Sequence, residues 1–322
     1  MSVALAEVAP FRLDPWYSVR PWGFRDLRPW YDRVAEGEPI GEVWLTGDDC
    51  LVATGAHAGK RLAELFAEEH SALLGTDAPT HDSPLLIKTI FAKEKLSVQV
   101  HPDDAMAQRY GDPRGKTECW YALAAEPGAK VAVGLKRGTT LAQIENGIKA
   151  GTLEQSLNAV PVEAGDMIYV DAGTVHAIWP GSILLETQQN CDLTYRMFDY
   201  GRGRELHIEK SLEATRLATS AGKVAPRLLA DRTVLIDVDY FRVERIPVAG
   251  SRTKESLCGA AEEPGLAYLF AAAGAGRIWG EGFEAVDLPA HCIAAAPAAS
   301  PEFVIEDVGG LDLIRITPKW PK

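Results

Sequence analysis

The sequence predicts a mainly β fold built from jelly-roll barrels, with a small helical insertion in the first barrel. Twenty-nine glycines and 20 prolines punctuate the 322 residues, a density that favours many turns and short strands. Strand-like runs recur between these turns along most of the chain, whereas helix-like patterns are confined to its first two-thirds. Short strands separated by turns are typical of β-sandwiches and barrels.

The composition is that of an ordinary globular protein, with 47% hydrophobic and 24% charged residues. A chain of this length buries a large core, so no disulfide or metal is needed for folding. The formal charge of −12 repels phosphate backbones, and we expect no nucleic-acid partner. Five widely spaced cysteines without a CxxC pair, no signal-peptide pattern at the N-terminus and no long apolar run predict a cytoplasmic protein without a membrane partner.

The first half of the chain is expected to alternate strands and helices. Residues 1–40 show no period and predict extended, loop-rich structure, and 41–47 predict a strand. Apolar residues between 60 and 74 share one helical face, which Gly75 ends. Strands are expected at 84–90, 96–101, 118–124 and 130–135, with a short helix within 103–112.

The second half is expected to contain fewer helices. Thr140 and Gln143 form a capping-box pattern that predicts a helix start, and a smaller helix is expected at 153–157. Strands and Gly turns alternate over 162–200, and a helix is expected at 206–217. The small residues 219–226 predict a linker, which places a larger domain at 1–220 and a smaller β-barrel domain at 221–322. Beyond the linker no helix is expected.

Two histidines and a glutamate stand out from the other candidate residues. Gln99 and His101 lie two apart in an apolar strand and so point to the same face. Glu118 opens a later strand, and His176 follows a Gly turn between two apolar runs. Such a set suits a mixed nitrogen and oxygen metal site for zinc, iron or manganese. By spacing alone, strand-end histidines and a surface carboxylate are the more common explanation for these residues.

Cations flank these residues in an otherwise acidic chain. Lys88 lies in an apolar strand and faces either solvent or a functional cavity. Lys116 precedes Glu118 by two residues and is expected on the same face. Arg196 either forms an ion pair with a neighbouring aspartate or joins both lysines in holding a phosphate, with the Ser97 hydroxyl as a further donor.

Several common motifs are absent from the sequence. There is no G-x-x-x-x-G-K-[ST] loop and no G-x-G-x-x-G after a strand, which leaves nucleotide binding without support. There is no G-x-S-x-G elbow of a serine hydrolase. The HxH pair that metal-dependent barrel oxygenases usually carry is also missing, which argues against that class of enzyme.

Four motifs in the same order resemble the short bacterial form of the type I phosphomannose isomerases. They are LLIKTIFAKEKLSVQVHPDD, GKTECWYAL, DAGTVHAI and ETQQNCDLTYRMFDYGRGRELHIEK, and the earlier GEVWLTG is similar to a further family element. The resemblance covers about residues 20–215. It implies a cupin-type barrel and interconversion of mannose 6-phosphate and fructose 6-phosphate, carried out with one zinc ion per chain.

The resemblance also implies a role for each matched residue. The zinc ligands would be Gln99, His101, Glu118 and His176, of which Gln99 is the least secure in short members of the family. Phosphate binding and proton transfer would fall to Lys88, Lys116 and Arg196, with Ser97 binding substrate and Asp192 a further active-site acid.

The chemistry that the resemblance implies fits these residue types. An enediol intermediate needs an electrophile for the developing oxyanion and a group that shuttles a proton. We favour Lys116 over Lys88 as this acid–base group and expect zinc and Arg196 to lower its pKa. A sugar-phosphate sensor on the same barrel and an iron-dependent oxygenase are the alternative functions, and both a monomer and a homodimer are compatible with the sequence.

Overall fold

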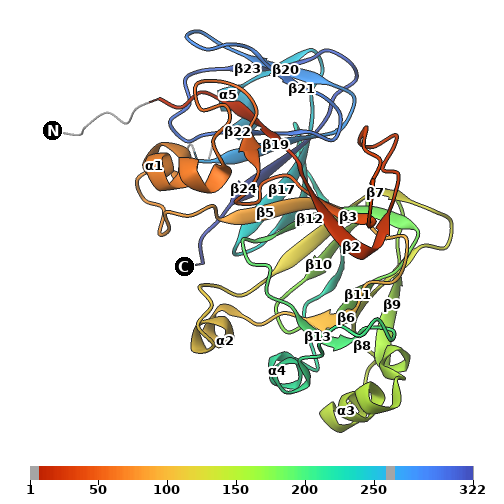
Figure 1. Cartoon of the computed structure of the whole chain (residues 1–322). Coiled ribbons are helices and arrows are strands. Elements are labelled where there is room, and N and C mark those ends of the chain that lie inside the picture. Colours follow the sequence, from red (N-terminus) through yellow and green to blue (C-terminus); the bar gives the residue numbers. More distant parts are fainter. Residues whose placement is uncertain (1–6, 259–264, 322) are drawn as a thin grey trace.

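Four antiparallel sheets form the framework of the residues that the structure describes, which confirms the mainly β class (Figure 1). The computed structural model describes residues 7–258 and 265–321. None of the helices in these ranges has the length and apolar character needed to cross a membrane.

Two sheets belong to the half of the molecule that carries the predicted site residues. The five-stranded sheet has the order β13 (Tyr195–Phe198), β6 (Val98–Val100), β11 (His176–Ile178), β8 (Lys130–Leu135), β9 (Leu157–Pro161). The seven-stranded sheet has the order β14 (Gly222–Val224), β10 (Met167–Val170), β7 (Glu118–Ala125), β12 (Ser182–Gln189), β5 (Leu85–Phe91), β3 (Ile40–Trp44), β2 (Trp16–Phe24).

The other two sheets hold mainly C-terminal strands. The eight-stranded sheet has the order β15 (Arg227–Leu228), β16 (Thr233–Asp237), β17 (Phe241–Pro247), β24 (Asp312–Pro318), β19 (Ala267–Ala273), β22 (Ile293–Ala296), β1 (Phe11–Asp14), β4 (Leu51–Val52). The four-stranded sheet has the order β18 (Ser251–Thr253), β23 (Val304–Asp307), β20 (Gly276–Trp279), β21 (Val286–Leu288).

The buried apolar side chains form layers between these sheets. One layer joins the five-stranded and seven-stranded sheets, a second joins the seven-stranded and eight-stranded sheets, and a third joins the eight-stranded and four-stranded sheets. The seven-stranded sheet is therefore covered on both faces. This explains why β5, LLIKTIF, is buried along its whole length and is apolar except for Lys88 and Thr89.

The helices lie outside the sheets, mostly where the sequence predicts them. They are α1 (Leu62–Leu74), α2 (Asp104–Arg109), α3 (Leu141–Ala150), the 3₁₀ turn η1 (Leu153–Ser156), α4 (Ile208–Ala214) and α5 (Lys254–Cys258). The predicted stop of α1 at Gly75 and the capping box of Thr140 and Gln143 at the start of α3 are confirmed. Helix α3 and η1 cover the outer face of the five-stranded sheet together with α4.

Some elements differ from the sequence-based predictions. Strands β1 and β2 form within the stretch expected to be loop-rich, and α4 is shorter than predicted. The C-terminal half contains α5, a helix too short to show a periodic pattern and with Leu257 as its buried side chain. The predicted linker holds β14, which pairs with β10 at the edge of the seven-stranded sheet.

The boundary between two barrels at residue 220 stays a prediction. Strands β1 and β4, from the first 52 residues, complete the sheet that is otherwise built from C-terminal strands. The N-terminal end of the chain therefore pairs with its C-terminal part.

Candidate functional site

Strand register brings the predicted site residues together between the five-stranded and seven-stranded sheets. In the five-stranded sheet, Gln99 of β6 lies opposite His176 of β11 on one side and Arg196 of β13 on the other. In the seven-stranded sheet, Glu186 of β12 lies opposite Lys88 of β5. Directly opposite residues have neighbouring side chains on one face of a sheet. The two sheets thus present their polar residues to a shared space.

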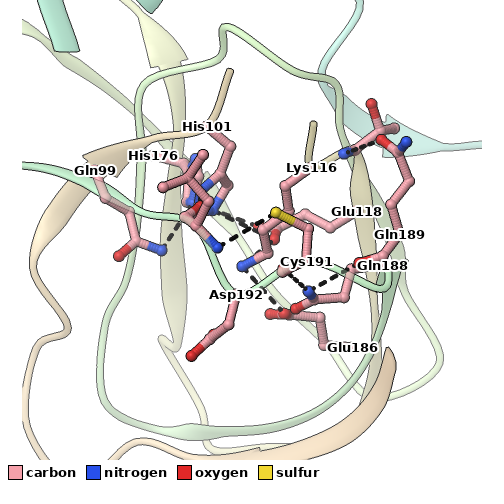
Figure 2. Close-up of polar contacts among 12 residues, drawn as sticks. Gln99, His101, Lys116, Glu118, His176, Glu186, Gln188, Gln189, Cys191 and Asp192 are labelled. Atoms are coloured by element: carbon pink, nitrogen blue, oxygen red, sulfur yellow. Dashed lines mark hydrogen bonds and ion pairs between the residues drawn. The ribbon is translucent and has the colours of Figure 1, made fainter. Parts of the chain in front are cut away.

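Three of the predicted metal ligands converge in this space. Their ligand atoms all lie within 4.8 Å of one another. His101 Nε2 lies 3.5 Å from Glu118 Oε2, and His176 Nε2 lies 3.4 Å from Glu118 Oε1 (Figure 2). The three side chains are almost fully buried.

Backbone carbonyls fix both imidazole rings. Nδ1 of His101 donates to the carbonyl of Leu193 at 2.8 Å, and Nδ1 of His176 donates to the carbonyl of Thr174 at 2.9 Å. Because a carbonyl only accepts, Nδ1 carries the hydrogen, and in the neutral ring Nε2 presents its lone pair to Glu118. Burial favours this neutral form: it lowers the pKa of His101 far below its ordinary value and that of His176 to about 4.

These residues fit a metal ion. Within the described ranges, His101 Nε2 and both carboxylate oxygens of Glu118 are buried without a hydrogen-bond partner. Unsatisfied buried polar atoms are costly, and a cation at their common focus would satisfy all of them. Two neutral imidazoles held by carbonyls and one carboxylate form a donor set typical of zinc.

Gln99 lies at the edge of this cluster. Its amide nitrogen donates to His176 Nε2 at 3.1 Å, and its oxygen faces the Ser97 hydroxyl at 3.2 Å. The same-face placement predicted from the strand pattern agrees with this position near the histidines. Rotation of the amide group would exchange its nitrogen and oxygen, so direct ligation by Gln99 stays a prediction.

Two lysines and three glutamates line the floor beside the histidines. The Lys116 ammonium lies 3.1 Å from Glu118 and 3.7 Å from Glu186. The Lys88 ammonium lies 3.2 Å from Glu186 and 3.7 Å from Glu42. Lys88 therefore faces a cavity, and the alternative of a solvent-facing lysine is wrong. Glu186 links both lysines and accepts a hydrogen bond from the indole nitrogen of Trp120 at 3.1 Å.

The pKa values of Glu186 and Lys116 are both raised, by different balances of burial and neighbouring charge. Burial raises the pKa of Glu186, and the charge of Glu118 adds to this rise. Burial disfavours the charged form of Lys116, but Glu118 and Glu186 outweigh it and raise its pKa. With only the protein's own groups acting on it, Lys116 therefore has a raised pKa, whereas the sequence analysis expected a lowered one. The expectation assumed a metal ion and a contribution from Arg196, whereas carboxylates are the charges that act most on Lys116.

A cavity of about 580 Å³ opens from this floor. Its volume lies within the range usual for small-molecule sites. Its charged and polar lining residues include Arg20, Glu42, Lys88, Ser97, Gln99, Lys116, Glu186, Asp192, Arg196 and Arg204. Five of these, namely Lys88, Ser97, Gln99, Lys116 and Arg196, were predicted to act at the site, and Asp192 was predicted as an acid beside them.

The guanidinium of Arg196 has a hydrogen-bond donor that no described residue uses. Its Nη1 donates to the carbonyl of Glu205 at 2.9 Å, and its Nε is buried without a hydrogen-bond partner in the described ranges. Asp199 pairs with Arg204 instead, at 2.8 Å and 2.5 Å, and Asp192 lies 3.8 Å from Arg20. Among the described residues no ion pair to Arg196 is formed, so the simple ion-pair interpretation is wrong.

Four charged residues at the cavity were not predicted from the sequence. Glu42 and Glu186 neutralise the lysines, and Arg20 and Arg204 stand beside the predicted cations. A signal was available for Glu186 in SILLETQQ. It is the one charged residue of a strand that is otherwise uncharged and almost entirely buried, as Lys88 is in its own strand.

Comparisons with known proteins find similarity to mannose-6-phosphate isomerases. Residues 18–133 match the family model described as phosphomannose isomerase type I, catalytic domain. The chain is 37% identical over 244 residues to a mannose-6-phosphate isomerase of Streptococcus mutans, covering 71% of this chain and 76% of that protein.

Solved structures agree with this match. The fold is similar to that of the mannose 6-phosphate isomerase of Bacillus subtilis, with a TM-score of 0.84 and 29% identity over 96% of this chain and all of that one. A mannose 6-phosphate isomerase bound with zinc and yttrium shares the fold at a TM-score of 0.75 and 16% identity, over 97% of this chain and all of that one.

Proposed function

Because the chain belongs to the type I phosphomannose isomerases, we propose that it interconverts mannose 6-phosphate and fructose 6-phosphate through an enediol. Members of this family are aldose–ketose isomerases. The observation that carries the proposal is the buried cluster of His101, Glu118 and His176, in which His101 Nε2 and both Glu118 oxygens lack a hydrogen-bond partner. This cluster adjoins a charged cavity through Gln99 and Lys116, which line it.

We assign a zinc ion to His101, Glu118 and His176, with Gln99 as the candidate fourth ligand. When bound, zinc supplies a Lewis acid that stabilises negative charge on a sugar oxygen. The carbonyls of Leu193 and Thr174 hold both rings with Nε2 directed at Glu118, which keeps the site ready for the cation. The zinc-bound isomerase that shares this fold supports the choice of metal.

Proton transfer is assigned to Lys116. Its ammonium lies between Glu118 and Glu186 at the floor of the cavity, so a proton can pass between the lysine and the sugar while Glu186 balances the charge. Lys88 contacts the same carboxylate from the neighbouring strand and is the second candidate. Glu42 and Glu186 neutralise Lys88, which makes its contribution to holding a phosphate smaller than that of an unpaired cation.

Phosphate binding is assigned first to Arg196. Its buried Nε is an unused donor beside the cavity, and a guanidinium pairs well with phosphate oxygens. The Ser97 hydroxyl and Asp192 line the same cavity and would orient the sugar. Binding of the remote phosphate then supplies energy to hold the reacting carbons in place.

The experiment that tests this function follows both turnover and solvent exchange. The zinc-loaded protein is incubated with mannose 6-phosphate in D₂O, and the products are observed by NMR. An enediol requires a carbon-bound proton to leave and return, so deuterium should enter at the carbon next to the carbonyl. Absence of deuterium from both sugars even after many reversible turnovers would contradict the enediol route. Saturable binding of mannose 6-phosphate without conversion would contradict the enzyme and favour the sensor.

A further inference from the structure

The segment 115–117, which leads into β7, carries Lys116 and ends beside Glu118. Both residues therefore depend on how this segment is held. The Asp104 carboxylate, in the first turn of α2, holds it by accepting from the Gly115 amide at 2.8 Å with Oδ1. The same oxygen accepts from Nε2 of Gln189 at 2.9 Å.

Gln189 ties the segment a second time. Its side-chain Oε1 accepts from the Thr117 backbone amide at 2.9 Å, and its backbone amide donates to the Thr117 carbonyl at 3.1 Å. The Lys116 amide donates to the Pro102 carbonyl at 3.0 Å. The backbone on both sides of the lysine is thus bound to α2 and to the end of β12.

The contact at Gly115 is close enough to exclude a side chain. A Cβ built there would lie 2.4 Å from the backbone carbon of Asp103 and 2.5 Å from the Pro102 oxygen. The chain therefore passes directly against the turn that follows His101. This approach sets how far Lys116 and Glu118 reach into the site.

The other oxygen of Asp104 reaches the C-terminal half of the chain. Its Oδ2 accepts from the Tyr240 hydroxyl at 2.8 Å. Tyr240 lies in the turn between β16 and β17, on the eight-stranded sheet. Asp104 thus joins α2 and the nearby lysine-bearing segment to the β16–β17 turn, which lies 136 residues further along the chain.

We propose that Asp104 is a positioning residue, which places Lys116 and Glu118 for catalysis and is itself held in place by Tyr240 and Gln189. The inference rests on the proposed isomerase function and deepens it. It also gives the C-terminal half of the chain a part in catalysis, because the Tyr240 hydroxyl orients the carboxylate that holds the segment.

Removal of the carboxylate should loosen the segment without removing any group that touches the sugar. Loss of residues that orient metal ligands typically costs about 10–100-fold in activity or metal affinity. We expect Asp104→Ala to lower kcat by that factor with a smaller change in KM, and to weaken zinc binding. Asp104→Asn should restore much of kcat, because an amide oxygen still accepts from Gly115 and Gln189 while its nitrogen donates to the tyrosine oxygen.

Asp103→Ala is the matched control. Asp103 caps α2 by accepting from the Met106 amide at 2.9 Å and pairs with Arg216 at 2.6 Å. Its loss harms α2 at least as much but leaves every contact of Gly115 and Gln189 intact. The control should lower the melting temperature and leave kcat near that of the wild type.

A double-mutant cycle isolates the contribution of Tyr240. Tyr240→Phe retains the ring and removes the hydroxyl, so kcat should fall severalfold in the wild-type background and hardly at all in the Asp104→Ala background. Equal effects in both backgrounds would show that the tyrosine acts independently of Asp104 and would overturn its part in the proposal.

Hydrogen exchange separates failure of this inference from failure of the proposed function. The Gly115 amide should exchange faster in Asp104→Ala than in the wild type or in Asp103→Ala. If Asp104→Ala has the same kcat, zinc affinity and Gly115 amide exchange rate as the wild type, the positioning role is overturned. If the wild type does not convert mannose 6-phosphate, the proposed function fails, and zinc affinity and exchange still decide whether Asp104 holds the segment.

Discussion

Replacing Arg196 by alanine separates a role in the reaction from a role in the fold. The side chain gives up one hydrogen bond to the Glu205 carbonyl. Asp199 keeps its two hydrogen bonds from Arg204, so no carboxylate is left unpaired. A single partly exposed contact of this kind contributes about 0–1 kcal/mol to the free energy of unfolding, and the melting temperature should hardly change.

The expected effect on turnover is much larger. If Arg196 directs its free donors at the substrate phosphate, its loss removes a preorganised charged group, which typically costs a hundredfold or more in kcat. A hundredfold corresponds to about 2.7 kcal/mol of transition-state stabilisation. The loss in activity would thus exceed the loss in stability by about 2 kcal/mol or more.

The assay couples fructose 6-phosphate formation to reduction of a nicotinamide cofactor and records kcat and KM beside the melting temperature. Arg277→Ala serves as control, since it also removes one positive charge, from an exposed pair with Asp287 in the C-terminal half. Near-normal kcat/KM in Arg196→Ala would refute the role in the reaction. A large drop in melting temperature would refute the argument that this arginine has no structural partner of importance.

Three further variants test the metal site and its surroundings. His101→Ala should lose zinc while remaining folded, because a chain of this length does not need a metal to fold; retained zinc by elemental analysis would exclude His101 as a ligand. Lys116→Ala should keep its zinc and lose most of its turnover, and normal turnover would move the proton-transfer role to Lys88. His291→Ala should leave zinc content unchanged, because this histidine donates from Nδ1 to the Trp30 carbonyl, far along the chain from the candidate ligands; loss of zinc would show a second site.

The sequence was enough to predict the class of fold and the polar centre of the site. Same-face placement of Gln99 and His101 follows from the alternation of side chains along a strand, and the family motifs add Glu118 and His176. The structure brings these four residues together. The sequence did not show which face of β5 carries Lys88. Both faces of this strand are buried, so it lacks the alternation of apolar and polar residues that would indicate where the lysine points.

The site residues that were not predicted from the sequence are brought into place by contacts between elements that are distant along the chain. Glu186 lies opposite Lys88 because β12 pairs with β5 in one register, and no local pattern specifies that register. Asp104 in α2 and Tyr240 in a turn, which are 136 residues apart, likewise meet only through the tertiary fold. Helix α5 and strand β14 were missed because they are short, and tertiary contacts form them more than local propensity does.

Metal removal and return in the wild-type protein tests whether the reaction depends on one zinc ion held by His101, Glu118 and His176. The protein is stripped with a chelator, dialysed, and reloaded with measured amounts of zinc while conversion of mannose 6-phosphate is recorded. Activity is expected to fall with the metal and to return in proportion to zinc, reaching its maximum at one ion per chain. Full activity in protein shown by elemental analysis to be free of metal would contradict this dependence on zinc.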